Sequence, residues 1–106
     1  MTCETGGHLP TVTVIIPAWD TYSGKQLQRA IDSVRQASSH DIDIIIVDNA
    51  NEPPLEFATC QTVRTEQRLS IGSARNLGLR HAKTEYVLFL DADDALTPDA
   101  IDNMRN

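Results

Sequence analysis

Three carboxylates, those of Asp91, Asp93 and Asp94, follow a short apolar run at residues 86–90. This pattern is typical of a buried strand, covered on both faces, that delivers acids to the carboxyl edge of a parallel sheet. Ligands bind at that edge in open α/β sheets. Crowded carboxylates repel one another unless a cation or a proton relieves them, and oxygen ligands suit Mg²⁺, Mn²⁺ or Ca²⁺, so we predict a divalent-metal site that holds a phosphorylated ligand. A solvated acidic turn is the alternative, because Asp also favours turns and helix starts.

A second set of candidate residues follows the first β-branched run, residues 11–16. We expect this strand to end at Pro17, because proline cannot donate to a sheet ladder. Ala18, Trp19 and Asp20 then fall in a loop at the carboxyl edge. Trp19 is either a core residue or a wall of the site.

Asp48 and Asn49 end the next β-branched run, residues 42–47. An acid at the end of the second strand of a βαβ unit is well placed to accept hydrogen bonds from a ribose. The same residues also suit a turn, since Asp and Asn are common turn formers. Both interpretations stay open from the sequence.

Arg75 lies near the start of a predicted helix at residues 72–82. A helix N-terminus favours anions, so an arginine there could reach a diphosphate. Alternatively, Arg75 is a surface residue or pairs with a carboxylate of the acidic cluster. Gly78 lowers helix stability, which indicates a position where the helix packs closely against a neighbour.

The alternation of strand and helix patterns predicts an α/β domain, a mostly parallel sheet with flanking helices. We expect residues 1–10 to be a flexible lead-in and residues 11–106 to form the domain. The expected strands are 11–16, 42–47, 59–64 and 85–90, and the expected helices are 25–37, 72–82 and one from residue 97 onwards.

Composition restricts the class of protein. A chain of 106 residues is one domain at most. A formal net charge of −6 and an aromatic content of 5% argue against a nucleic-acid surface. Cys3 and Cys60 are too few for a zinc site or a disulfide framework. No apolar run approaches ~18 residues and the start lacks a signal-peptide pattern, so we expect no membrane span and a cytoplasmic location, at the inner membrane face if another segment or partner holds it there.

Four segments in this order resemble the family-two glycosyltransferases with the GT-A fold. The segments are residues 14–19, 46–49, 72–78 and 89–94, and they cover almost the whole chain from Thr11. The resemblance implies the N-terminal nucleotide-sugar-binding half of such a domain, with strand order 3-2-1-4. It also implies transfer of a sugar from a nucleotide-diphosphate sugar, UDP-linked by expectation, to an acceptor hydroxyl with inversion.

The resemblance also implies roles for the residues at the nucleotide end. Asp48 matches an acid that contacts the uracil or ribose, and Pro17 and Ala18 match the loop that borders the base. We include Trp19 and Asp20 in this donor-binding set. Two departures from the family pattern bear on the base contacts: Asp20 often is Asn in the family, and Asn49 often is an acid.

The diphosphate end follows from the same resemblance. Arg75 matches a residue near the diphosphate-sugar, and Asp91-Ala92-Asp93 matches the Asp-x-Asp motif. In that motif Asp91 lies by the ribose and sugar, and Asp93 holds Mn²⁺ or Mg²⁺, so we assign the metal to Asp93 and Asp91. Asp94 matches an acid that shapes the donor-sugar pocket.

No residue qualifies as the catalytic base that an inverting transfer needs. Family members continue well past this point, and we expect the base in the part that follows; Asp99 and Asp102 are poor candidates. The main alternative is a non-catalytic module that binds a nucleotide, a metal or a partner chain.

Two other enzyme or receiver classes fit the chain less well. A phosphoacceptor receiver domain would need paired acids after the first strand and a late lysine, whereas this chain has Pro17 there and Lys83 before the fourth strand. A nucleotidyltransferase would need a Gly-rich basic loop. A fourth strand without its usual neighbour leaves an open edge, so we also expect marginal stability, or association with itself or a partner through that edge.

Overall fold

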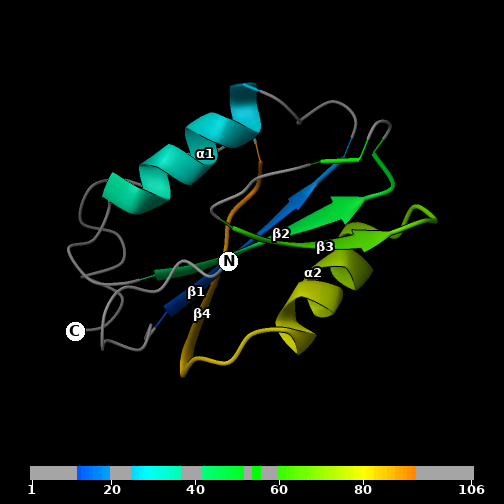
Figure 1. The fold of residues 1–106 in the computed structure, drawn as a ribbon. Coiled ribbons are helices and arrows are strands. Elements are labelled where there is room, and N and C mark those ends of the chain that lie inside the picture. Colours follow the sequence, from blue (N-terminus) through cyan, green and yellow to red (C-terminus); the bar gives the residue numbers. More distant parts are fainter. Residues whose placement is uncertain (1–11, 20–24, 37–41, 52–53, 56–59, 93–106) are drawn as a thin grey trace.

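The computed structural model describes residues 12–19, 25–36, 42–51, 54–55 and 60–92. These residues form one parallel sheet of four strands, with a helix on each face (Figure 1). The predicted lead-in at 1–10 and the predicted helix from 97 onwards lie outside the described residues. The elements are β1 (Val12–Ala18), α1 (Lys25–Gln36), β2 (Ile42–Asn49), β3 (Gln61–Thr65), α2 (Ile71–Arg80) and β4 (Tyr86–Phe89).

The strand order is β3-β2-β1-β4, as the family resemblance implied. β1 pairs with β2 from Val12↔Ile42 to Ala18↔Asp48. All pairings are parallel, so every strand ends at the same edge of the sheet. This edge brings together the residues that follow β1, β2 and β4. The two helices were predicted to within two residues at each end.

Pro17 does not end the first strand as we expected, since β1 continues to Ala18. The Ile15 carbonyl accepts a hydrogen bond from the Leu90 N–H at 3.0 Å, so the backbone polar groups of residue 15 point toward β4. The backbone groups of successive strand residues point alternately to the two neighbouring strands, and those of position 17 therefore also point toward β4. Pairing with β4 stops at Ile15↔Phe89. The missing N–H of Pro17 lies beyond that ladder, where proline is tolerated.

The sheet separates two apolar cores. The larger core lies under α1, whose buried residues form one apolar stripe, and the smaller core lies under α2. Alternate residues of β1 serve the two sides, because successive side chains of a strand point to opposite faces. The α1 side buries Val12, Val14, Ile16 and Ala18 from β1 with Leu27, Ala30, Ile31 and Val34, and the α2 side buries Ile15, Ile45, Val47 and Ala74.

Helix α2 lies close against the sheet at Gly78, as predicted from that glycine. A Cβ atom at this position would lie 2.5 Å from Ile15 Cγ2 and 3.0 Å from Val47 Cγ2. The helix begins at Ser70, whose Oγ accepts a hydrogen bond from the Ser73 N–H at 3.2 Å. Such a cap satisfies one of the free amides at the helix start.

Strand β4 is only partly buried, whereas we expected a buried strand covered on both faces. Tyr86 and Phe89 are 39% and 40% exposed, while Val87 and Leu88 pack against the two cores. Within the described residues, β4 pairs only with β1 and is an edge strand. The remaining boundaries shift slightly: β2 continues to Asn49 and β3 runs from Gln61 to Thr65.

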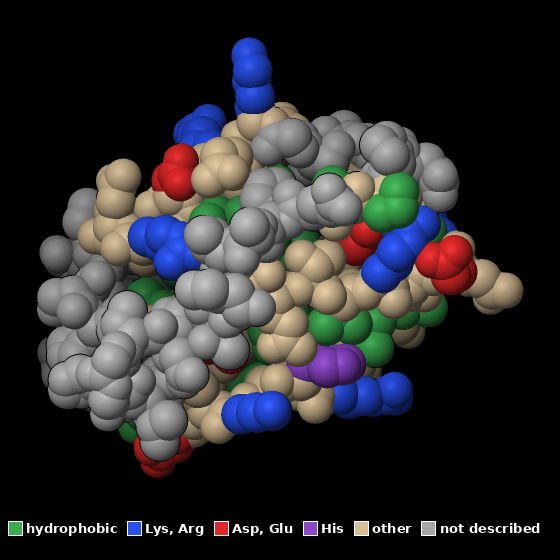
Figure 2. All heavy atoms as spheres, viewed as in Figure 1, with side chains coloured by type: hydrophobic (Ala, Val, Ile, Leu, Met, Phe, Trp, Pro, Cys, Tyr) green, Lys and Arg blue, Asp and Glu red, His purple; other side chains and the backbone are tan. Residues whose placement is uncertain are grey.

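Charged side chains are scattered over the described surface in Figure 2, with acidic and basic groups interspersed. Neither α1 nor α2, the two described helices, is long and apolar enough to cross a membrane.

Candidate functional site

Three neighbouring strands place Ala18, Asp48 and Arg64 side by side near the carboxyl edge. Ala18 pairs in register with Asp48, and Asp48 pairs in register with Arg64. Residues in register on parallel strands share one face of the sheet, here the face of α1 that buries Ala18. The fold therefore sets a buried carboxylate between a backbone segment of β1 and a guanidinium of β3.

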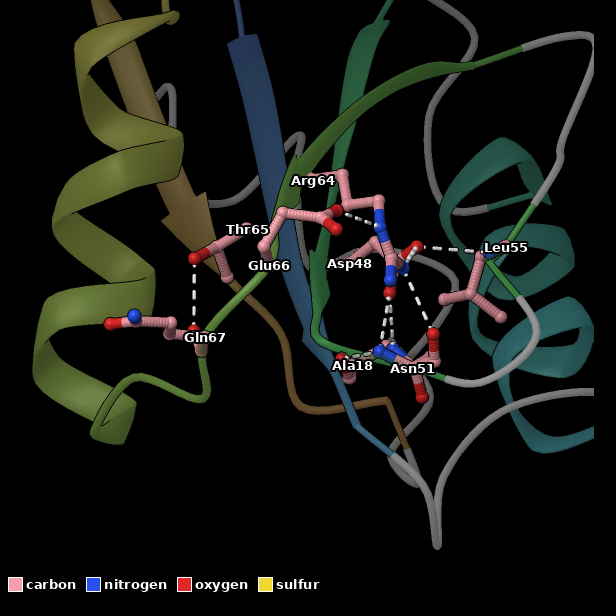
Figure 3. Close-up of polar contacts among 8 residues, drawn as sticks. All are labelled: Ala18, Asp48, Asn51, Leu55, Arg64, Thr65, Glu66 and Gln67. Atoms are coloured by element: carbon pink, nitrogen blue, oxygen red, sulfur yellow. Dashed lines mark hydrogen bonds and ion pairs between the residues drawn. The ribbon is translucent and has the colours of Figure 1, made fainter.

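The Asp48 carboxylate accepts four hydrogen bonds, three from the loop that follows β2 and one from β3 (Figure 3). Oδ1 accepts from the Asn51 N–H at 3.0 Å and from Asn51 Nδ2 at 2.6 Å. Oδ2 accepts from the Leu55 N–H at 2.9 Å and from Arg64 Nη1 at 2.8 Å. Asp48 is fully buried, and its hydrogen bonds to Asn51 and Leu55 fix the conformation of this loop.

The pKa of Asp48 reflects two opposed effects. Burial by itself raises the pKa of this carboxyl, because it disfavours the charged form. The hydrogen bonds from Leu55, Asn51 and Arg64 outweigh burial, and the pKa lies below its ordinary value of 3.8. Asp48 is therefore ionised at neutral pH, and its negative charge is compensated by Arg64.

Arg64 joins this loop to β3. Nη1 also donates to the Asn51 carbonyl at 2.9 Å, and Nε donates to Glu66 Oε2 at 2.7 Å. Glu66 and then Asp48 raise the pKa of Arg64. The loop itself begins with a turn, one of the two interpretations that the sequence left open for Asp48 and Asn49. Ala50 has φ 57° and its N–H donates to the Asp48 carbonyl at 3.0 Å.

Asn49 fixes the segment that leads into α2. Its Nδ2 donates to the Leu69 carbonyl at 2.9 Å, and its Oδ1 accepts from the Leu69 N–H at 2.8 Å. These two bonds fix the backbone of Leu69 in the way that paired hydrogen bonds from a neighbouring strand would. Beside this clamp lies an open cavity of about 140 Å³, lined by Trp19, Asn49, Arg68, Leu69 and Ile71. Trp19 is thus a wall of a cavity at the carboxyl edge, one of the two roles that the sequence left open.

Arg75 and Asp91 meet on the other side of β1. Arg75 Nη2 lies 3.1 Å from Asp91 Oδ1, and the two side chains are 39% and 47% exposed. The guanidinium carbon lies 5.8 Å from the centroid of the Phe89 ring. Arg75 Nε is buried, and no residue in the described part of the chain forms a hydrogen bond with it. The predicted alternative, an ion pair between Arg75 and the acidic cluster, is present in this structure.

The acidic cluster is described only in part. Asp91 lies within the described residues, whereas Asp93, Asp94 and Asp20 lie outside them, as do Asp99 and Asp102. Within the described ranges, no three Asp, Glu, His or Cys side chains gather into a metal-binding group. Asp91 offers a half-exposed carboxylate at the edge, and its oxygens are ligands that Mg²⁺ and Mn²⁺ prefer. The residue present is compatible with the predicted metal.

Sequence reasoning missed the roles of Arg64, Asn51 and the backbone of Leu69. Arg64 was expected only as the last residue of a third strand. A usable signal was available, because strand order 3-2-1 places the end of the third strand beside Asp48, and a buried acid there needs a cationic partner.

Comparisons with known proteins show the family of this chain. The model of the family described as Glycosyl transferase family 2 matches residues 13–106. A poly(ribitol-phosphate) beta-N-acetylglucosaminyltransferase, TarP of Staphylococcus aureus, is 37% identical over 90% of this chain and 32% of its own length. The succinoglycan biosynthesis protein ExoW of Rhizobium meliloti is 31% identical over 87% of this chain and 32% of its own length.

Solved structures show the same fold. Residues 1–349 of S. aureus TarS match with a TM-score of 0.73 and 19% identity, over 90% of this chain and 31% of that one. The same TarS fragment in complex with UDP matches with a TM-score of 0.74 and 18% identity, again over 90% of this chain and 31% of that one. The chain therefore spans about a third of the length of the proteins it matches.

Proposed function

The chain belongs to glycosyl transferase family 2 and has the GT-A fold, and from this premise we propose that it is the donor-binding part of a sugar transferase. The donor in this proposal is a UDP-linked sugar, and the transfer to an acceptor hydroxyl inverts the anomeric centre. The observation that carries the proposal is the pairing of Arg75 with Asp91 at the carboxyl edge, one Nη2–Oδ1 contact of 3.1 Å between residues of α2 and the turn after β4.

The nucleotide base is assigned to the end of β1. Pro17, Ala18, Trp19 and Asp20 border it, and the cavity of about 140 Å³ beside Trp19 supplies an apolar wall. A flat ring against an aromatic side chain gains both buried area and stacking. TarS, a protein of the same fold, has been solved in complex with UDP, which supports UDP as the nucleotide of the donor.

The diphosphate is assigned to Arg75, whose guanidinium presents several N–H donors to phosphate oxygens. Its buried Nε without a partner supports a ligand there, because a buried donor is rarely left unpaired. Asp91 and Asp93 would hold Mn²⁺ or Mg²⁺, and Asp94 would border the donor sugar. When bound, such an ion supplies a Lewis acid that neutralises charge on the departing nucleoside diphosphate.

The part played by this chain is binding and orientation of the donor. The base that deprotonates the acceptor is expected in the remainder of a complete enzyme, since relatives are about three times as long. A cytoplasmic location stays a prediction, as does association through the edge of β4.

Calorimetric titration of UDP into the 106-residue chain, with Mn²⁺ and with EDTA, tests the proposal. We expect binding that requires Mn²⁺ and is lost in Asp93→Asn. Asp32→Asn is the matched control, because Asp32 lies on the exposed side of α1 and loses the same charge. A folded wild-type protein that binds no UDP with Mn²⁺ would contradict the proposal and favour a non-catalytic remnant or partner-binding module.

A further inference from the structure

Asp48 has little capacity left for a ligand. Both carboxylate oxygens already accept two hydrogen bonds each, and the residue is fully buried. A direct bond to a nucleoside would have to compete with these donors. The structure therefore points to a neighbouring group as the atom that contacts the ligand.

Asn51 supplies such a group. The residue is 2% exposed, and its Nδ2 donates to the Ala18 carbonyl at 2.8 Å and to Asp48. Its Oδ1 is a buried acceptor that has no hydrogen-bond partner among the described residues. An Asn side chain in a turn commonly accepts from an N–H two or three residues later, but those positions hold Pro53 and Pro54, which have no N–H. This acceptor needs a donor from outside the turn.

We propose that Asn51 Oδ1 accepts a hydrogen bond from an N–H or O–H of the nucleoside, and that Arg64 is the positioning residue that holds Asn51 in place. This inference rests on the proposed function, because it concerns the nucleoside end of the same donor site. Asp48 is also a positioning residue, because its carboxylate connects Arg64 to Asn51.

Arg64 is suited to that role by its contacts. Its Nη1 lies between two acceptors of the loop, Asp48 Oδ2 at 2.8 Å and the Asn51 carbonyl at 2.9 Å. Asp48 in turn holds both the backbone and the side chain of Asn51. The series of contacts runs from β3 through the loop after β2 to the Ala18 carbonyl of β1 (Figure 3). Trp19 is the next residue in the sequence. A lysine cannot reproduce the planar set of donors.

Two probes separate the ends of the donor site. Uridine reports on the nucleoside end alone, and UDP with Mg²⁺ reports on both ends. Arg64→Gln should weaken uridine and UDP by the same factor, about tenfold, and Arg64→Lys should weaken both by a smaller common factor. Arg75→Gln should weaken UDP and leave uridine unchanged. The control Arg80→Gln, on the exposed last turn of α2, should change neither.

Affinities are measured by NMR titration on samples whose circular dichroism shows them folded. The side-chain amide signal of Asn51 in the wild type gives a readout that needs no variant and that a purely structural role would not move. We expect it to shift on addition of uridine, together with the Trp19 indole signal. The inference is overturned if the indole signal shifts and the Asn51 amide does not, or if folded Arg64→Lys binds uridine as tightly as wild type. Wild type that binds neither uridine nor UDP would instead contradict the proposed function.

Discussion

Asp48 and Asp91 come at the ends of the two strands that flank β1, yet their surroundings differ. Asp48 is fully buried and accepts four hydrogen bonds, whereas Asp91 is 47% exposed and forms an ion pair with Arg75. Two acids of the same type at the same sheet edge thus have different roles. The first stabilises the loop that shapes the edge, and the second remains accessible to a ligand.

The position of each strand explains this difference. β2 lies between β1 and β3, so the end of β2 is covered by residues of both neighbours, including Arg64. β4 is the edge strand of the described sheet, and its end has a strand neighbour on one side only. A buried charge is costly unless it is paired, whereas an exposed charge is solvated by water and gains little from a partner.

The largest expected effect comes from removing the buried charge. Asp48→Asn leaves Arg64 without its buried partner and turns an amide NH₂ toward donors of Asn51 and Leu55. We expect a loss of about 3 kcal/mol in the free energy of unfolding, measured by urea denaturation. Asp91→Asn serves as the matched variant and should change stability by no more than about 0.5 kcal/mol. Equal losses in the two variants would abolish the contrast between the two acids.

The next effect concerns the approach of α2 that brings Arg75 to Asp91. Gly78→Ala would place a Cβ 2.5 Å from Ile15 Cγ2. We expect a destabilisation of about 1–3 kcal/mol from overpacking, which exceeds the helix-propensity gain of about 1 kcal/mol. Gly72→Ala is the control, because nothing lies within 4 Å of its Cβ position. Thermal denaturation of both variants is the measurement, and a Gly78→Ala protein as stable as Gly72→Ala would refute close packing.

A smaller effect appears in the pH dependence of stability. The folded-state pKa of Asp48 lies below its ordinary value of 3.8. The stabilisation by this ionised group is therefore complete above 3.8 and is lost as the pH falls through the folded-state pKa. The difference in unfolding free energy between wild type and Asp48→Asn should be constant near neutral pH and shrink on acidification below 3.8. A difference that stays constant throughout acid titration would contradict the assigned role of the Asp48 charge.

The smallest effect on stability is expected at the exposed ion pair. Arg75→Gln should change the unfolding free energy by less than about 0.5 kcal/mol, yet weaken UDP binding about tenfold through the loss of a charge-assisted hydrogen bond. Arg80→Gln on the same helix should leave both quantities unchanged. Calorimetry measures UDP binding and urea denaturation measures stability on the same samples, and together they separate the effect of Arg75→Gln from that of Asp48→Asn. A large loss of stability in Arg75→Gln would refute the prediction that this ion pair contributes little to stability.

The sequence predicted the fold well because the main patterns are local. β-Branched runs and an amphipathic stripe on α1 depend on residues close in the chain, and Gly78 pointed correctly to close helix packing. The end of β1 at Pro17 was wrong because the position of a proline relative to a neighbouring strand depends on tertiary register. The expected full burial of β4 was wrong for a similar reason, since an apolar run does not reveal that the strand lies at the edge of the sheet, where only part of its surface is covered.

The candidate site was predicted less completely. Local motifs located Asp48, Arg75 and Asp91, and the ion pair of Arg75 with an acid was among the alternatives. The four-donor surroundings of Asp48 were not anticipated, because Arg64 and Leu55 reach it across 16 and 7 residues of sequence. The unpaired Oδ1 of Asn51 required coordinates, since only a three-dimensional arrangement shows which acceptors are buried.

One comparison tests most directly whether the accessible Asp91 contributes to ligand binding. It is the increase in stability that the ligand produces in wild type and in Asp91→Asn. The measurement is the urea midpoint of each protein with and without UDP and Mn²⁺. Without ligand, the two midpoints should coincide. With free UDP at about 100 times Kd, wild type should gain about 2.7 kcal/mol, and Asp91→Asn should gain much less. Equal stabilisation of both proteins, or a large loss of stability in unliganded Asp91→Asn, would contradict the account.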